Sequence, residues 1–156
     1  AVVFTTSTRG SGAGEEVPPG YIEQWRKLAD AGIRVLAVRD NPWMSFEVAE
    51  CVELHVATAP ECARPREQML ARVSPIEKLN APLANVRFVD LSDFFCNQTS
   101  CVPVAGNVLI YRDQHHITAT YARTLAPMLR AEVLTAATEG RGTDALSAAF
   151  GKSSSH

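Results

Sequence analysis

The sequence predicts an α/β fold in which a parallel β-sheet is sandwiched by helices. Short apolar runs rich in β-branched residues begin at Ala1, Ile33 and Val86, as is typical of strands buried in a parallel sheet. Apolar residues at helical spacing separate the first two runs, and a strand, a helix and a strand in succession favour parallel pairing with a right-handed crossover. A chain of 156 residues accommodates one domain of ordinary size.

The first strand is expected over residues 1–6, all of which are apolar or β-branched, in the pattern of a buried strand. Because the chain starts directly in this run, we expect it to be a fragment of a longer polypeptide whose targeting sequence lies upstream. Glycines at 10, 12 and 14 predict a flexible rim at the carboxyl end of the strand, where open α/β sheets bind ligands. No G-K-S/T sequence follows them, which argues against a nucleotide site.

The middle of the chain predicts one helix of ordinary length and several short elements. The helix ends near Gly32 and has an apolar face formed by Ile22, Trp25, Leu28 and Ala29. Strands are expected over 33–38 and 86–91. Between these strands, prolines divide the chain into short pieces, one of which is a helix near 68–73.

The last third predicts a fourth strand over 108–111 and a capped helix. Thr118 is a suitable N-cap, and Pro127 is expected to kink the helix. The apolar face of this helix consists of Tyr121, Leu125, Met128 and Leu129. Gly, Ser and Thr dominate the end of the chain, so we assign the domain to residues 1–137 and a flexible tail to residues 138–156.

Four cysteines form two local pairs, Cys51 with Cys62 and Cys96 with Cys101. The even number and the close spacing predict two disulfides, and therefore an oxidising compartment outside the cytoplasm. In the chain-entropy model each bridge stabilises the fold by about 2–3 kcal/mol. Four free buried thiols are the alternative, and neither spacing is the C-x-x-C that structural zinc commonly uses.

Composition narrows the class of protein. Hydrophobic residues make up 46% and charged residues 21% of the chain, as in soluble globular proteins. The net charge of −2 provides no basic patch, so we expect no nucleic-acid partner. No apolar run reaches the roughly 18 residues that crossing a bilayer requires.

Residues 111–118, Tyr-Arg-Asp-Gln-His-His-Ile-Thr, are the most informative about chemistry. Asp113 precedes His116 by three residues, between the fourth strand and the last helix. In one assignment Asp113 accepts the imidazole N–H and fixes its tautomer, and His116 becomes the general base toward a serine hydroxyl. His115 competes for this role because D-x-H and D-x-x-H overlap. The simplest alternative is two surface histidines at a helix start, with Asp113 supporting the helix N-terminus.

The nucleophile has no clear position, because no serine lies in a G-x-S-x-G or Gly-Asp-Ser sequence. Ser7, at the end of the first strand, is the nearest candidate, although a hydroxyl that lines the pocket is the simpler interpretation. Arg9, on the same loop, could bind an acyl or sugar oxygen or be a solvated charge. We therefore assign Ser7 and Arg9 to substrate binding.

Residues 107–127 resemble the last conserved block of SGNH hydrolase domains, and more narrowly of those fused behind the membrane domain of acyltransferase family 3 proteins. The runs 3–9, 38–42 and 89–93 and the second cysteine pair fit that fused group. The resemblance covers roughly residues 1–132. It implies a flavodoxin-like, SGNH-type sheet that is incomplete at its N-terminus here.

Within this resemblance Asp113 and His116 match the aspartate and histidine of the catalytic triad. The family's Gly-Asp-Ser block, which carries the nucleophile, and its G-x-N-D oxyanion block are not visible in the sequence. The resemblance therefore implies that the serine lies outside this chain. We expect the chain alone to be inactive.

The resemblance also implies a location and partners. The domain would be extracytoplasmic and tethered through an upstream transmembrane acyltransferase domain that delivers the acyl donor. It would pass the acyl group through an acyl-serine to a hydroxyl of a cell-envelope glycan or glycolipid, with no cofactor and no metal. A non-catalytic glycan-binding or docking domain is one alternative, and a metal-binding protein that uses His115, His116 and nearby carboxylates is another.

Overall fold

The computed structural model describes residues 1–56, 60–79 and 83–138. Its centre is a sheet of three parallel strands in the order β1 (Val2–Thr6), β2 (Arg34–Val38) and β4 (Val86–Val89). Both ladders run without a bulge, from Val2 opposite Arg34 in the first and from Val35 opposite Val86 in the second. All three strands therefore end at one edge of the sheet, and the prediction of an α/β fold with a parallel sheet is confirmed.

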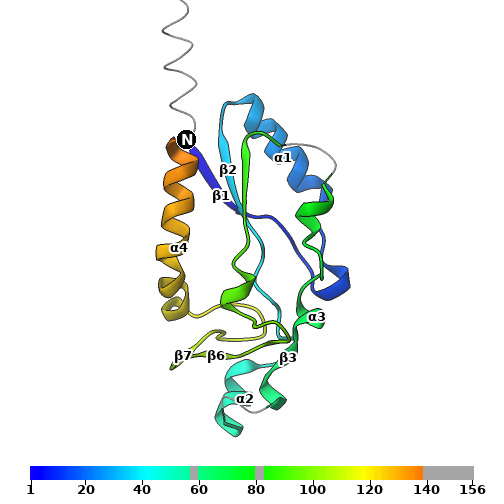
Figure 1. The fold of residues 1–156 in the computed structure, drawn as a ribbon, viewed down its shortest axis with the longest axis vertical. Helices are drawn as coiled ribbons and strands as arrows, with labels where there is room; N and C mark the ends of the chain where they lie inside the picture. The colour runs from blue at the N-terminus through cyan, green and yellow to red at the C-terminus, as the bar shows by residue number, and fades with distance from the viewer. Residues whose placement is uncertain (57–59, 80–82, 139–156) are drawn as a thin grey trace, which may run out of the picture.

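Helices cover both faces of this sheet (Figure 1). The two long ones are α1 (Pro19–Asp30) and α4 (Ala119–Thr138). Side chains alternate along β2, so Val35 and Ala37 pack with Trp25 of α1, while Leu36 belongs to the core cluster that contains Leu125 of α4. β2 is thus buried from both sides, as its continuous apolar run predicts.

The remaining elements are short, and two small antiparallel pairs, β3 with β5 and β6 with β7, lie outside the main sheet. Their bounds are η1 (Gly12–Gly14), α2 (Val48–Leu54), η2 (Pro60–Cys62), β3 (Arg64–Pro65), α3 (Arg66–Met69), η3 (Pro75–Lys78), η4 (Ser92–Phe94), β5 (Ser100–Cys101), β6 (Val104–Ala105) and β7 (Val108–Leu109). The helix predicted near 68–73 is α3. It ends at Met69 because Leu70 has an extended backbone and a buried side chain.

β1 corrects the expectation that residues 1–6 form a buried strand. It lies at the edge of the sheet and pairs only with β2. As a result Phe4 is 59% exposed and Val3 is also exposed. The residues of β1 are those of a buried strand, but complete burial needs a neighbour that none of the described residues provides.

The strand predicted over 108–111 is shorter than expected and lies outside the main sheet. Only Val108–Leu109 form a ladder, as β7, and it runs antiparallel to β6. Gly106 makes the turn between the two strands with a φ of 58°, in the region that favours glycine. The Ile110 N–H then bonds to the Pro103 carbonyl at 2.8 Å, so the segment pairs locally.

A buried ion pair fixes the glycine-rich loop, in contrast to the flexible rim that its glycines predict. Glu15 accepts hydrogen bonds from Arg39 Nε at 2.7 Å and from Nη2 at 2.6 Å, and both side chains are at most 5% exposed. Arg39 also donates to Asp90 at 2.9 Å and to the Ala71 carbonyl at 3.1 Å. Because Glu15, Arg39 and Asp90 follow β1, β2 and β4 respectively, one guanidinium joins the ends of all three strands.

The ends of the long helices agree with the sequence. α1 ends at Asp30, and Gly32 follows with a φ of 66°. Thr118 caps α4, because its Oγ1 accepts the Tyr121 N–H at 3.1 Å. The same hydroxyl donates to the Leu109 carbonyl at 2.7 Å, which ties the helix to β7. Residues 139–156 of the predicted tail lie outside the described residues.

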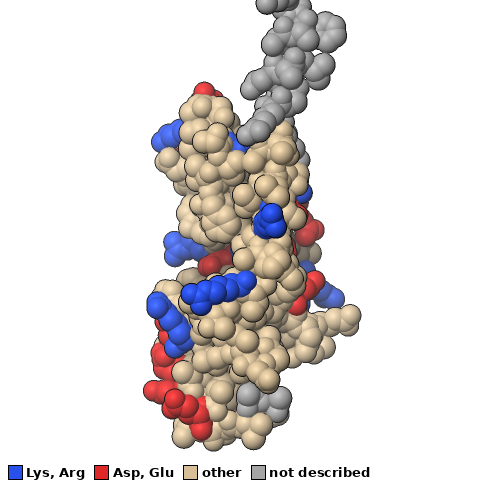
Figure 2. Space-filling view, turned by 90° about the vertical axis from the view of Figure 1, so that its left-hand side faces the viewer, with Lys and Arg blue, Asp and Glu red and all other residues tan. Residues whose placement is uncertain are grey.

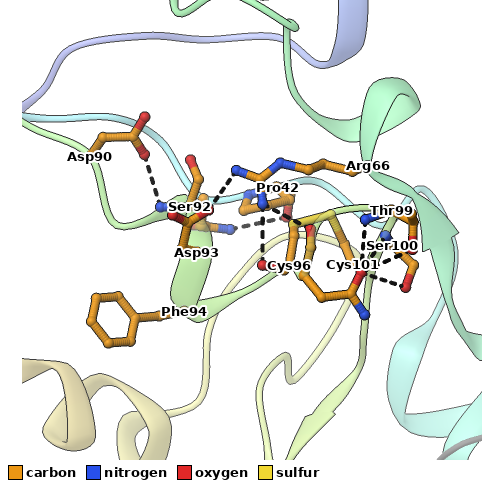
Figure 3. Close-up of a disulfide and its surroundings, with 12 residues drawn as sticks. Pro42, Arg66, Asp90, Ser92, Asp93, Phe94, Cys96, Thr99, Ser100 and Cys101 are labelled. Carbon is orange, nitrogen blue, oxygen red and sulfur yellow. Dashed lines mark hydrogen bonds and ion pairs between the residues drawn. A yellow bond between two sulfur atoms is a disulfide. The ribbon is translucent and has the colours of Figure 1, made fainter.

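Both predicted disulfides are confirmed, Cys51–Cys62 and Cys96–Cys101. Figure 3 shows the second one beside Arg66, which extends over the loop that the bridge closes. The Arg66 guanidinium donates to the Cys96 carbonyl at 3.2 Å, to the Asn97 carbonyl at 2.9 Å and to Asp93 at 2.7 Å. The bridge and the arginine together hold this loop against α3.

None of the helices in the described parts of the chain combines the length and the apolar character that a membrane span requires.

We predict that Arg39→Met lowers the free energy of unfolding by about 3–5 kcal/mol, because it leaves the Glu15 carboxylate buried without its partner. Urea denaturation measures this cost. The double variant Arg39→Met/Glu15→Leu should lose less than the single one, since no buried charge is then stranded and Asp90, whose side chain is 44% exposed, can be hydrated. Arg26→Met is the control, because this arginine lies on the exposed side of α1 and an exposed charge contributes about 1 kcal/mol or less. Equal losses in the two single variants would contradict this account.

Candidate active site

The loop that carries Asp113 and His116 is closed at its base by backbone hydrogen bonds. The Arg112 N–H bonds to the His116 carbonyl at 2.9 Å, and the Thr118 N–H bonds to the Ile110 carbonyl at 2.7 Å. The turn is therefore closed between the residues that follow β7 and the residues that precede α4. This places its side chains at a defined point rather than on an open loop.

Asp113 organises the inside of this loop. Its Oδ1 accepts the backbone N–H groups of His115 at 3.0 Å and His116 at 2.8 Å, as an Asx turn does. Its Oδ2 lies 2.8 Å from His116 Nδ1. The carboxylate thus fixes both the backbone and the imidazole of the loop.

These contacts lower the pKa of Asp113 well below its ordinary value. The backbone N–H groups of His115 and His116 are the main cause, and the His116 side chain adds to them. An ionised carboxylate can only accept hydrogen bonds, so Nδ1 of neutral His116 must carry the proton. Nε2 is then the basic nitrogen, and 53% of the His116 side chain is exposed.

His115 has a different environment. Its Nδ1 is 4.0 Å from Asp113, beyond hydrogen-bond distance. Its ring instead packs against Trp43, at 5.2 Å between centroids, and against His116, at 4.1 Å. Of the two assignments that the sequence leaves open, the geometry favours the pair of Asp113 with His116.

A second loop, after β2, supports the first from the side. Asn41 Nδ2 donates to the His115 carbonyl at 2.7 Å, and the Met44 N–H bonds to the Gln114 carbonyl at the same distance. This role of Asn41 is not among the predictions from the sequence. The available signal was a pair of polar residues, Asp40 and Asn41, directly after a buried parallel strand, where ligand sites of α/β sheets lie.

His116 opens into a cavity of about 560 Å³ at the carboxyl edge of the sheet. Its lining combines charged, aromatic and apolar side chains, namely Asp40, Asn41, Trp43, Arg112, His115, His116, Ile117 and Ala119. A smaller apolar cavity of about 200 Å³ lies beside it between the sheet and α4. The two cavities share Asp40, Asn41 and Ile117 in their linings, so they meet close to His116.

Asp40 is the second carboxylate of this cavity. Burial raises its pKa, while hydrogen bonds from Trp43 and Asn41 act in the opposite direction. Its Oδ2 accepts Trp43 Nε1–H at 3.1 Å and its Oδ1 accepts the Asn41 N–H at 3.0 Å. Asp113 and Asp40 thus have pKa values displaced in opposite directions within one site.

The structure does not bring the predicted substrate residues Ser7 and Arg9 into this cavity. The Ser7 side chain is fully buried, and its hydroxyl has no hydrogen-bond partner among the described residues. Arg9 is exposed and forms an isolated bridge with Glu16. No serine of the described residues lines the His116 cavity, so a nucleophile is not presented there.

The same loop offers a set of metal ligands. Asp113, His115 and His116 each place one ligand atom within 4.8 Å of the others. An ion that took Asp113 Oδ2 would compete with the hydrogen bond to His116. Metal binding and orientation of the base are therefore opposing uses of this carboxylate.

A parallel sheet that holds a carboxylate-oriented histidine at its carboxyl edge is the arrangement of a hydrolase-type α/β domain. The family model for the SGNH domain (fused to AT3 domains) matches residues 3–131, and the chain belongs to this family. No curated protein matches the chain, and neither does any solved structure. Family membership makes this an acyltransferase- or esterase-type domain and confirms the resemblance that residues 107–127 indicate.

We predict that the carboxyl ¹³C signal of Asp113 titrates in NMR with a midpoint well below the ordinary value of about 3.9. His116→Ala should leave most of this lowering, because backbone N–H groups are its main cause. Ionised Asp113 then stabilises the fold above pH 4, and this contribution is lost as the pH falls through its folded pKa. An ordinary midpoint in the wild type would refute the Asx-turn geometry.

Proposed function

We propose that this domain transfers an acyl group through a serine acyl-enzyme, with His116 as general base and Asp113 as its orienting carboxylate. The observation that carries the proposal is the 2.8 Å contact between Asp113 Oδ2 and His116 Nδ1, which leaves Nε2 available in a residue that lines an open cavity. The serine belongs to a segment outside these 156 residues.

The reaction follows from these positions. The serine hydroxyl transfers its proton to His116 Nε2 while its oxygen attacks the acyl carbonyl carbon, and the leaving alcohol departs with that proton. In the second half, His116 removes the proton of an acceptor hydroxyl or of water, whose oxygen attacks the acyl-serine. The proton returns to the serine oxygen. Asp113 stays ionised throughout and stabilises the imidazolium that forms twice in each cycle.

The open edge of β1 supports the placement of the missing serine. A strand paired there in parallel, as the other strands are, would end at the same edge of the sheet as β2, whose last residues lead into Asp40 and Asn41. Phe4 of β1 and Leu134 of α4 are more than half exposed nearby in the fold. On the face seen in Figure 2, charged side chains gather across the middle and lower left, while the upper part carries few of them.

The family and the cysteines support a location and partners for this domain. Two disulfides suit an oxidising compartment, and fusion to AT3 domains in this family suits an acyl donor delivered by a membrane acyltransferase. We place the domain outside the cytoplasm, tethered to the membrane, with a hydroxyl of a cell-envelope glycan or glycolipid as the acyl acceptor. The chemistry above requires no cofactor.

A non-catalytic domain that keeps the fold and binds glycans is the second candidate. The observation in its favour is that no serine of the described residues lines the His116 cavity. A complete domain without ester hydrolysis would favour it.

We predict that the complete domain, including the segment with the serine, hydrolyses p-nitrophenyl acetate. His116→Ala should lower kcat by about 10⁴- to 10⁶-fold, since it removes the base. His115→Ala should retain far more activity, because its ring does not bond Asp113. Glu53→Gln, on the exposed face of α2, is the unaffected control. Equal rates in the two histidine variants would reject His116 as the base.

A further inference from the structure

Trp43 is held rigidly at the wall of the His116 cavity. Its Nε1–H donates to Asp40 at 3.1 Å, and its ring packs against His115 at 5.2 Å between centroids. The indole is only partly buried and it lines the cavity. Because its single donor is already used, the indole can offer a ligand only its π surface.

Two charged groups complete this wall. Each oxygen of Asp40 accepts one N–H within the protein, which leaves further lone pairs for hydroxyl donors in the cavity. The Arg112 side chain is 66% exposed and lies 3.6 Å from Asp113, so most of its N–H groups can donate to a ligand. The cavity therefore offers an aromatic surface, an acceptor and a donor.

This combination selects a class of ligand. A flat apolar surface in the same cavity as a hydroxyl acceptor and a donor suits a ring with one apolar C–H face and hydroxyls on its rim, as a pyranose has. An aliphatic acyl chain would leave these polar groups without hydrogen-bond partners. The smaller apolar cavity beside the His116 cavity suits such a chain better. The cavity volume of about 560 Å³ is large enough to hold a whole sugar ring and not only the hydroxyl that reacts.

We propose that Asp40, Trp43 and Arg112 form a pyranose-binding subsite, which holds the sugar whose hydroxyl accepts the acyl group beside His116. The proposal rests on the function proposed above and adds the residues that recognise the acceptor. Trp43 stacks on the apolar face of the sugar, Asp40 accepts its hydroxyls and Arg112 donates to its oxygens.

The test is direct binding by the complete domain, independent of turnover. Cellotetraose, mannotetraose and chitotetraose are titrated by calorimetry, and the indole N–H signal of Trp43 is followed by NMR. At least one of these probes should bind and shift this signal. Trp43→Ala, Asp40→Asn and Arg112→Gln should each weaken binding about tenfold or more, which corresponds to about 1.4 kcal/mol. Glu53→Gln should bind as the wild type does.

Arg112→Gln keeps the test valid if the other variants fold poorly, because this side chain is largely exposed. No binding of any probe at about 10 mM, or binding by the variants within twofold of the wild type, overturns the subsite. Hydrolysis of p-nitrophenyl acetate without sugar binding overturns the subsite and leaves the proposed function intact. Sugar binding without hydrolysis supports the sugar site and counts against the acyl-transfer function.

Discussion

The bond network of Arg39 is the constraint on which the carboxyl edge of this domain depends. A buried guanidinium joins Glu15, Asp90 and the Ala71 carbonyl, and so connects the loops that follow three parallel strands. Residues 40 and 41 come directly after it, and Asn41 supports the loop of Asp113 and His116 through its hydrogen bond to the His115 carbonyl. The positions of the site residues are thus set by a charge pair that touches no substrate. Such a buried ion pair contributes more to the positions of the residues around it than to the net free energy of folding.

The site is held both by local contacts and by contacts between segments that are distant in the chain. Asp113 and His116 are arranged by contacts within a few residues of each other, and their hydrogen bond exists before any ligand binds. The surrounding cavity is arranged by contacts between distant segments. Preorganised donors and acceptors of this kind lower the reorganisation that a reaction requires.

The features predicted correctly from the sequence are those encoded locally. Continuous apolar runs indicate β2 and β4, a glycine indicates the end of α1, and Thr118 indicates the start of α4. Close cysteine spacing predicts both disulfides, and the D-x-x-H spacing brings Asp113 to His116. The features that were not predicted depend on contacts with segments far away in the chain. The exposure of Phe4, the burial of Glu15 and the role of Trp43 are set by segments that no local pattern specifies.

The double use of the Thr118 hydroxyl bears on the order in which the site assembles. One oxygen accepts the Tyr121 N–H and donates to the Leu109 carbonyl, so nucleating α4 and closing the dyad loop are a single event over thirteen residues of chain. The Asn41 bond to His115 instead spans a separation of 74 residues and forms only after collapse of the whole sheet. The folding chain therefore forms the loop of Asp113 and His116 early and completes the cavity wall at Asn41 late.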